Sequence, residues 1–130
     1  MDEAELLKRL NERYGSLYSP QGRLIPRREK IFLYSGPEVV LKYGWCGLHI
    51  ANMDLSLTIE GAQLLGATAS KNLVAITPEQ AKEYYLGRDL PGFEGDGYVI
   101  LRTAHRIVGP GLLGGGLIKN TLPDSRKTKL

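Results

Sequence analysis

Glycine and proline divide this chain into short segments, and this limits the fold more than any other feature of the sequence. There are 16 glycines and 7 prolines among 130 residues, and they separate apolar runs such as KIFLYS, NLVAI and YVILRT. Runs of this length, bounded by turn residues, are typical of short strands. Helical segments do not alternate with strands at the length that a doubly wound sheet needs. We therefore predict an α+β fold, a small mixed β pseudo-barrel with short flanking helices and an N-terminal helix.

Three segments have the pattern of helices. Residues 2–14 place leucines at helical spacing on one face and are followed by a glycine. A shorter helix is expected after Thr58, because threonine is a good N-cap residue. The clearest signal lies at residues 77–87, where Thr77 is followed by a proline and a capping-box glutamine, and where Gly87 ends the helix.

The other segments predict the strands and the division of the chain. Residues 16–28 have the prolines and glycines of a connector, so we expect an N-terminal helix and connector over residues 1–28 and one domain over residues 29–130. The last two strands are expected to be short and to flank a glycine-rich turn at residues 110–116. The expected strands are 30–35, 39–43, 45–51, 72–76 (buried, from its unbroken apolar run), 98–103, 106–109 and 116–120.

Composition excludes several classes of protein. A chain of 130 residues with 42% hydrophobic residues can form one globular core, and it contains no apolar run of the ~20 residues that span a membrane. The charged N-terminus is not a secretory signal, so we expect a cytoplasmic protein. The single cysteine, Cys46, forms no internal disulfide, and we interpret it as a buried thiol. His49 and His105 lie near no carboxylate at metal-binding spacing, so no metal site is expected.

Positive charge is modest overall but gathers in two places. The net charge is +3 with a pI near 9.0, which hints at a polyanionic partner. One cluster lies in the run RLIPRREK and the other in the C-terminal tail, where Arg126, Lys127 and Lys129 follow a single acid, Asp124. Single clusters of this kind are most often solvated loops, so they do not by themselves assign a function.

The glycines near the C-terminus raise the possibility of a nucleotide-binding loop. Gly109, Gly111 and Gly114 satisfy the spacing G-x-G-x-x-G. That fingerprint requires a following helix whose N-terminus faces the phosphate, and the residues that follow here cannot form one of useful length. No acid–base or nucleophile constellation is present either, so no cofactor and no catalytic residue is expected.

Several short motifs occur in an order that resembles a known family. They are EGAQLLG at residues 60–66, YYLGRDL at 84–90, GYVILR at 97–102, VGPG at 108–111 and GLIKNTLPDSRK at 116–127. This series resembles the PUA-like RNA-binding domain at the C-terminus of NOL1/NOP2/Sun-type RNA cytosine-5 methyltransferases, which also occurs in stand-alone archaeal proteins. The similarity covers roughly residues 30–128. The cofactor motif and the catalytic Pro-Cys of the methyltransferase domain are absent from this sequence, where Trp45 precedes Cys46.

The resemblance implies a PUA-like fold and contact with structured RNA, tRNA or rRNA. It implies that Lys119, Asn120 and Arg126 of the closing motif contact RNA, together with the turn glycines Gly109 and Gly111. Two positions depart from the family pattern, since Leu112 and Asp124 stand where the family often has lysine. Both departures remove positive charge from the expected RNA face.

Further cations near these motifs could add phosphate contacts. Lys127 and Lys129 extend the closing motif, and Arg102, His105 and Arg106 would form a second strip at a turn between strands. Tyr84 and Tyr85 could offer stacking faces, although packing into the core is the simpler interpretation for at least one of them. Of Leu112 and Leu113, we expect one in the core.

Three classes of function remain open from the sequence. The favoured one is a non-catalytic RNA-binding module, accessory to RNA modification or ribosome biogenesis, with an RNA-modifying enzyme as a further partner. The alternative is a protein-interaction adaptor in ribosome assembly without tight RNA binding. An enzyme is the least favoured, and neither DNA nor a membrane is expected as a partner.

Overall fold

The N-terminal helix forms where its leucine pattern predicts it. In the computed structural model, which describes residues 2–36 and 47–128, α1 spans Glu3–Tyr14. The Asp2 side chain accepts a hydrogen bond from the Glu5 N–H at 2.8 Å, and Gly15 ends the helix in the left-handed conformation with φ 57°. The buried residues of α1 share one face, so this helix covers one side of the core.

An antiparallel sheet of three strands follows, in the order β1-β2-β3. The strands are β1 (Arg23–Arg27), β2 (Lys30–Tyr34) and β3 (Leu48–Asn52). The prediction of a connector over residues 16–28 is wrong for its second half, which is β1. Pro26 obscured this strand, but β1 is an edge strand, where a missing N–H donor leaves no neighbour unsatisfied. The strand expected at 39–43, with Trp45 and Cys46, lies outside the described residues.

A second, mixed sheet of five strands has the order β4-β6-β7-β8-β5. Only β4 runs parallel to its neighbour β6, and the other pairs are antiparallel. β4 lies at the edge and is half-buried to exposed, so its predicted full burial is wrong. The strands are β4 (Leu73–Ala75), β5 (Leu90–Pro91), β6 (Gly97–Arg102), β7 (Ile107–Gly114) and β8 (Leu117–Asn120).

The glycine-rich turn is much shorter than the sequence predicts. Residues 110–114 belong to β7, and the chain reverses only at Gly115 and Gly116, whose φ angles are 60° and 81°. Two residues with positive φ match the tight hairpin turn that twisted strands favour, and glycine adopts it without strain. Gly109 and Gly111 therefore lie inside a strand and not in a turn.

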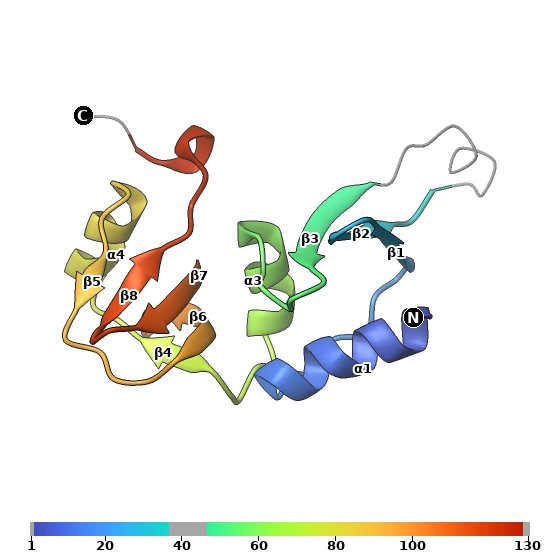
Figure 1. The fold of residues 1–130 in the computed structure, drawn as a ribbon, viewed down its shortest axis with the longest axis horizontal. Coiled ribbons are helices and arrows are strands. Elements are labelled where there is room, and N and C mark those ends of the chain that lie inside the picture. The colour runs from blue at the N-terminus through green and yellow to red at the C-terminus, as the bar shows by residue number, and fades with distance from the viewer. Residues whose placement is uncertain (1, 37–46, 129–130) are drawn as a thin grey trace.

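The two short helices confirm the capping signals. α3 (Ile59–Gly66) has Thr58 as its N-cap residue, and α4 (Pro78–Tyr85) begins with the complete capping box of Thr77 and Gln80. Figure 1 shows α3 between the two sheets. α4 lies beside β5 and β8, at the end of the molecule opposite the first sheet. A single 3₁₀ turn, η1 (Asp124–Arg126), follows the last strand.

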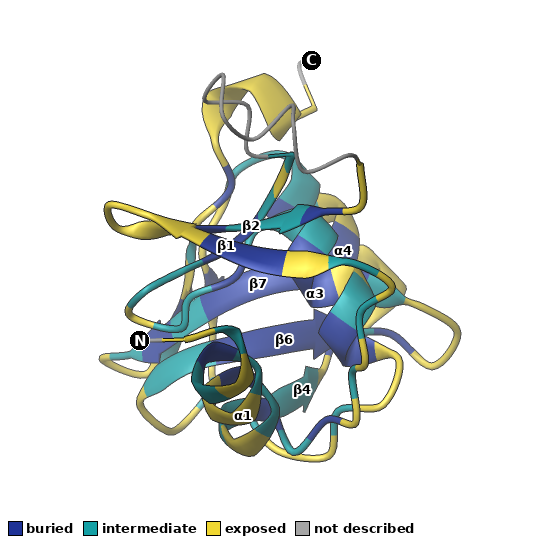
Figure 2. Ribbon diagram, turned by 90° about the vertical axis from the view of Figure 1, so that its right-hand side faces the viewer, coloured by how far each residue is buried: buried dark blue, intermediate teal, exposed yellow. Residues whose placement is uncertain are grey.

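The sheets and helices share two hydrophobic clusters, and β6 connects them. Ile100 packs in the cluster formed with α1, α3 and the first sheet, whereas Val99 and Leu101 pack with α4 in the other. All three side chains are buried, because β6 is covered on both faces (Figure 2). The fold is thus α+β with a small barrel-like core, as the sequence predicts. No helix among residues 2–36 and 47–128 is long and apolar enough to cross a membrane.

The close approach of α3 to β3 gives the first testable prediction. A methyl group at Gly61 would overlap the backbone carbonyl of Ile50, which accepts the Thr58 N–H at 3.0 Å and so holds the start of α3 against β3. Glycine to alanine in a helix usually stabilises by about 1 kcal/mol, but here we expect Gly61→Ala to lower the free energy of unfolding by about 1–3 kcal/mol. Urea denaturation measures the change. The control is Gly66→Ala in the same helix, which meets only the side chain of Ile107 and should cost less than half as much.

Candidate nucleic-acid interface

A groove of about 490 Å³ lies between the first sheet with α3 and the C-terminal segment. Its walls combine apolar side chains with a few polar groups that could bind a ligand, which is typical of binding sites. Residues from distant parts of the chain form it: Leu48, His49, Asn52, Leu57, Thr58, Ile59, Glu60, Pro110, Thr121, Leu122, Pro123, Ser125 and Arg126.

Of the predicted RNA-contacting residues, Arg126 lines this groove and Lys119 lies beside it. Lys119 is exposed on β8 and is not itself among the residues that line the groove. Lys119 also pairs with Leu112 on β7, two positions from the groove residue Pro110. Arg126 therefore lies in the groove lining, and the exposed Lys119 lies on the neighbouring part of the β7–β8 sheet.

Arg126 is held across the groove by an acid that the sequence analysis did not single out as a site residue. Its guanidinium forms an ion pair with Glu60 in the first turn of α3, and their side chains are 45% and 32% exposed. Burial of the Glu60 carboxyl opposes ionisation, but the hydrogen bond and charge of Arg126 outweigh it and hold the pKa of Glu60 below its ordinary value. A partly exposed pair of this kind stabilises by at most about 1 kcal/mol, so a stronger anion can replace the carboxylate.

Lys127 contributes mainly to holding the tail in place. Its ammonium binds the Asp124 carboxylate at 3.0 Å, and its aliphatic part packs against Gly87 after α4. The next residue, Thr128, donates its N–H to the Tyr85 carbonyl at 2.6 Å. Asp124 is almost fully exposed, so its charge faces solvent and neutralises part of the positive charge here.

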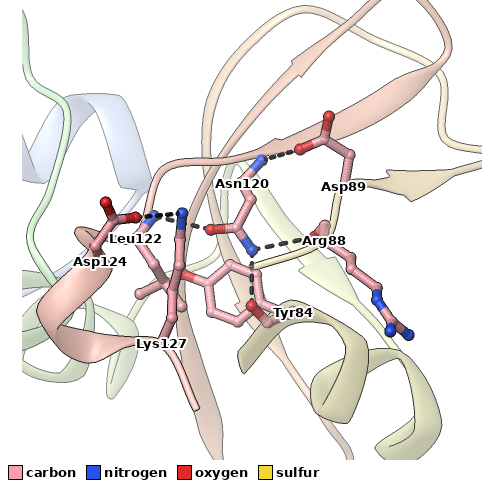
Figure 3. Close-up of polar contacts among 7 residues, drawn as sticks. All are labelled: Tyr84, Arg88, Asp89, Asn120, Leu122, Asp124 and Lys127. Carbon is pink, nitrogen blue, oxygen red and sulfur yellow. Dashed lines mark hydrogen bonds and ion pairs between the residues drawn. The ribbon is translucent and has the colours of Figure 1, made fainter. Parts of the chain in front are cut away.

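Asn120 has a structural role, and the RNA contact that the resemblance implies for it stays a prediction. Figure 3 shows its side-chain amide donating to the Tyr84 carbonyl at 2.7 Å and to the Arg88 carbonyl at 3.1 Å. The side-chain oxygen accepts from the Leu122 N–H at 3.0 Å. Its backbone N–H donates to the Asp89 carboxylate at 2.8 Å. These bonds occupy both donors of the amide, so Asn120 ties the end of β8 to the end of α4.

The two candidate glycines are also explained by packing. Both are buried within β7, where a Cβ on Gly109 would lie 2.6 Å from the Tyr84 hydroxyl oxygen and one on Gly111 would lie 2.7 Å from a methyl group of Ile118. The structure therefore corrects the interpretation that these glycines shape a turn at the RNA face. Side chains of α4 and β8 lie so close to β7 at these two positions that no Cβ fits there.

The adjacent tyrosines of α4 are fixed against the same strand. Tyr84 is fully buried, and its hydroxyl donates to the Pro110 carbonyl at 2.6 Å. The half-buried Tyr85 donates to the Val108 carbonyl at 3.1 Å. Burial raises the pKa of Tyr84 far above its ordinary value, so this hydroxyl stays protonated and remains a donor. A stacking role is excluded for Tyr84, which belongs to the core. Leu113 also belongs to the core, so one of Leu112 and Leu113 is buried there as expected.

The second predicted strip lies apart from the groove. His105 and Arg106 are exposed in the turn between β6 and β7, and Arg102 is half-buried at the end of β6. The five steps along β7 from Ile107 to Leu112 span about 17 Å, which separates this turn from the β7 residue paired with Lys119. The structure thus separates Arg102, His105 and Arg106 from Lys119, and none of the three lines the groove.

The comparison with known proteins bears on the same C-terminal half. Residues 71–127 match the family model described as the methyltransferase RsmF PUA domain. Residues 71–127 form a PUA-like domain of the NOL1/NOP2/Sun methyltransferase type. The matched model is that of the PUA domain and not of a catalytic domain. The boundary expected after residue 28 coincides with the turn between β1 and β2 and stays a prediction.

Similarity to individual proteins extends beyond the PUA-like domain. The ribosomal RNA small subunit methyltransferase F of Aeromonas hydrophila is 32% identical over 127 residues, which cover 91% of this chain and 26% of that protein. The protein of the same name from Vibrio cholerae is 27% identical over 132 residues, covering 93% of this chain and 28% of the relative. The chain thus spans about a quarter of the length of the curated relatives it matches. These relatives are bacterial, and the archaeal resemblance stays a prediction.

A metal centre has no support among the described residues. No group of three or more His, Cys, Asp or Glu side chains in residues 2–36 and 47–128 could hold a metal ion. His49 instead contacts Asn52, with its Nε2 3.0 Å from the Asn52 amide oxygen.

The packing role of the β7 glycines can be tested with a matched pair of variants. Gly111→Ala should lower the free energy of unfolding by about 1–3 kcal/mol, because its methyl group meets the side chains of Ile118 and Leu101. Gly114→Ala lies on the same strand with open space around it, and we expect a change within about 0.5 kcal/mol. Chemical denaturation measures both variants. Equal stability of the two would contradict the packing role.

Proposed function

We propose that this chain is a non-catalytic RNA-binding module that uses the groove between α3 and the C-terminal segment. The observation that supports this most directly is Arg126 in the lining of a concave surface, with the exposed Lys119 nearby on β8. Apolar walls with a cation in the lining suit a nucleotide, whose base is apolar on its faces and whose phosphate is anionic. The basic turn with Arg102, His105 and Arg106 would contact the backbone of the same RNA at another position.

Ribosomal RNA is the preferred class of partner in this proposal. The similar proteins of Aeromonas and Vibrio are named as ribosomal RNA small subunit methyltransferases. A module similar to one part of such enzymes would bind structured RNA and act beside an RNA-modifying enzyme. The module would supply affinity and positioning, and the chemistry would belong to another domain or protein. A protein-interaction adaptor remains the alternative if no structured RNA binds.

The proposal predicts a loss of salt-dependent affinity when both groove cations are removed. Each lysine or arginine that meets a phosphate releases counterions, with about 0.7–0.9 in the slope of log affinity against log salt. The double change Lys119→Gln and Arg126→Gln should therefore weaken binding to rRNA fragments and reduce this slope by about 1.4–1.8. Fluorescence anisotropy across a salt series measures it.

A matched control separates a local contact from the loss of net charge. Lys8→Gln with Arg9→Gln removes the same charge from the exposed face of α1, where both residues pair with glutamates of that helix. We expect this variant to bind nearly as tightly as the original protein. Equal loss in the two double variants would argue against the groove, and no binding of any structured RNA at low salt would overturn the proposal.

Breaking the ion pair across the groove should raise RNA affinity, whereas removing the cations should lower it. Glu60→Gln removes the carboxylate that competes with phosphate for Arg126, so RNA affinity should rise by up to about fivefold, the factor that matches about 1 kcal/mol. Glu12→Gln is the control, because it removes one acid of equal charge that is paired with Lys8 on α1. The same anisotropy titration compares them. An unchanged or lower affinity of Glu60→Gln would show that Arg126 does not meet phosphate.

A further inference from the structure

The outer face of the first sheet carries cations around an aromatic side chain. Ile31 points into the core and is fully buried, so strand alternation turns Lys30 and Phe32 to the opposite face of β2. The tip of the β1–β2 hairpin is exposed (Figure 2). Together with Arg27, Arg28 and Glu29, these two residues line a second concave surface of about 650 Å³. The face therefore combines positive charge with an accessible ring.

The ring of Phe32 is extended by a neighbouring imidazole. His49 on β3 pairs with Phe32 across the sheet, and the two ring centres lie 5.4 Å apart at an angle of 40°. Asn52 holds the imidazole through the contact at Nε2, and its own amide donates to the Ser56 hydroxyl at 3.0 Å. Both rings are half-buried, so part of each remains accessible. They form an oriented aromatic platform on a rigid sheet.

His49 also connects this platform to the groove beside Arg126. It lines the groove with Leu48 and Asn52, while its partner Phe32 lines the concave surface at the hairpin. The Phe32–His49 contact therefore joins one residue of each concave surface.

We propose that this surface binds a single-stranded RNA segment, with one unpaired base stacked on the Phe32 ring beside His49 and with adjoining phosphates at Arg28 and Lys30. The inference rests on the proposed RNA-binding function and extends it to a surface outside residues 71–127. Aromatic rings interleaved with cations favour single-stranded nucleic acid, because every base has a face that stacks and every linkage carries a negative charge. A duplex would keep its bases stacked internally and could use only the cations.

The position of Glu29 at the hairpin tip indicates which side of the surface the RNA backbone would follow. Glu29 is the single acid lining the surface, and its backbone carbonyl accepts the Met53 N–H at 2.8 Å, which anchors the turn. Its carboxylate would repel phosphate, so the backbone of the RNA should pass on the side of Arg28 and Lys30. Arg28 has a positive φ of 57°, and its side chain is exposed at the turn.

Two RNA probes test the proposal on the whole chain. One is a hairpin RNA with a single-stranded uridine overhang, and the other is the same hairpin with a blunt end. The original protein should bind the overhang RNA more tightly. Phe32→Leu keeps an apolar side chain but removes the ring, so affinity for the overhang RNA should fall about fivefold or more, the lower limit for stacking of one base, with little change for the blunt RNA.

The cations of the hairpin give a second measurement. Arg28→Gln with Lys30→Gln should reduce the salt slope for the overhang RNA by about 1.4, two contacts at about 0.7 each, and leave the slope for the blunt RNA unchanged. Lys8→Gln with Arg9→Gln on α1 is again the matched control and should change neither slope. Thermal melting checks that each variant is folded.

Crosslinking uses the original protein, so its result does not depend on whether a variant folds. A 4-thiouridine in the overhang should crosslink, on irradiation, to the peptides that contain Phe32 or His49. Crosslinks confined to other peptides, or equal binding of the two RNAs, would overturn this inference. The groove variant Lys119→Gln/Arg126→Gln separates the two proposals: if it weakens binding while the hairpin variant does not, the proposed function stands alone.

Discussion

The position of the candidate interface depends on the side chain of Asn120. Two carbonyl groups near the end of α4 accept its amide hydrogens, and its side-chain oxygen accepts the Leu122 N–H. The chain is thereby turned so that Leu122 enters the core and η1 follows directly. Arg126 then lies opposite Glu60 of α3, on the other side of the groove. A polar contact inside the protein thus sets where the basic tail meets the rest of the molecule.

The electrostatics of the groove suit reversible binding of an anion. The Arg126–Glu60 pair is partly exposed, so it orients the guanidinium without stabilising the fold strongly. RNA phosphates can replace the carboxylate at small cost, and Lys119 adds a second cation beside the groove. Asp124 removes some of this attraction, which favours modest affinity over tight binding. Such a module would serve best when another domain or partner adds contacts to the same RNA.

Local signals in the sequence predict local structure well. The capping box at Thr77 and Gln80 and the stop at Gly15 depend on residues within one helical turn, and both are present. β1 was missed because a proline inside a strand is unfavourable except at an edge, and edge position is a property of the whole sheet. The short strands bounded by glycine and proline indicated a small mixed barrel, and the resemblance to the PUA-like family implied the same type of fold.

The candidate site was harder to predict, because its residues owe their roles to distant partners. Glycine at 109 is explained by Tyr84, and glycine at 111 by Ile118, neither of which is a neighbour in sequence. Asn120 belongs to the family motif, yet its amide is occupied within the protein. The Glu60–Arg126 pair joins positions 66 residues apart, which no local pattern connects. Lys119 was named from the family motif and is exposed on β8, and its contact with RNA stays a prediction.

Chemical-shift mapping tests the central claim most directly. The amide resonances of the isotope-labelled chain would be followed while an rRNA fragment is added at low salt and again at high salt. The account predicts that the largest shifts cluster around the groove, at residues 58–60 and 119–126, and that they diminish at high salt. Shifts concentrated on the exposed face of α1, with the groove unaffected, would contradict it.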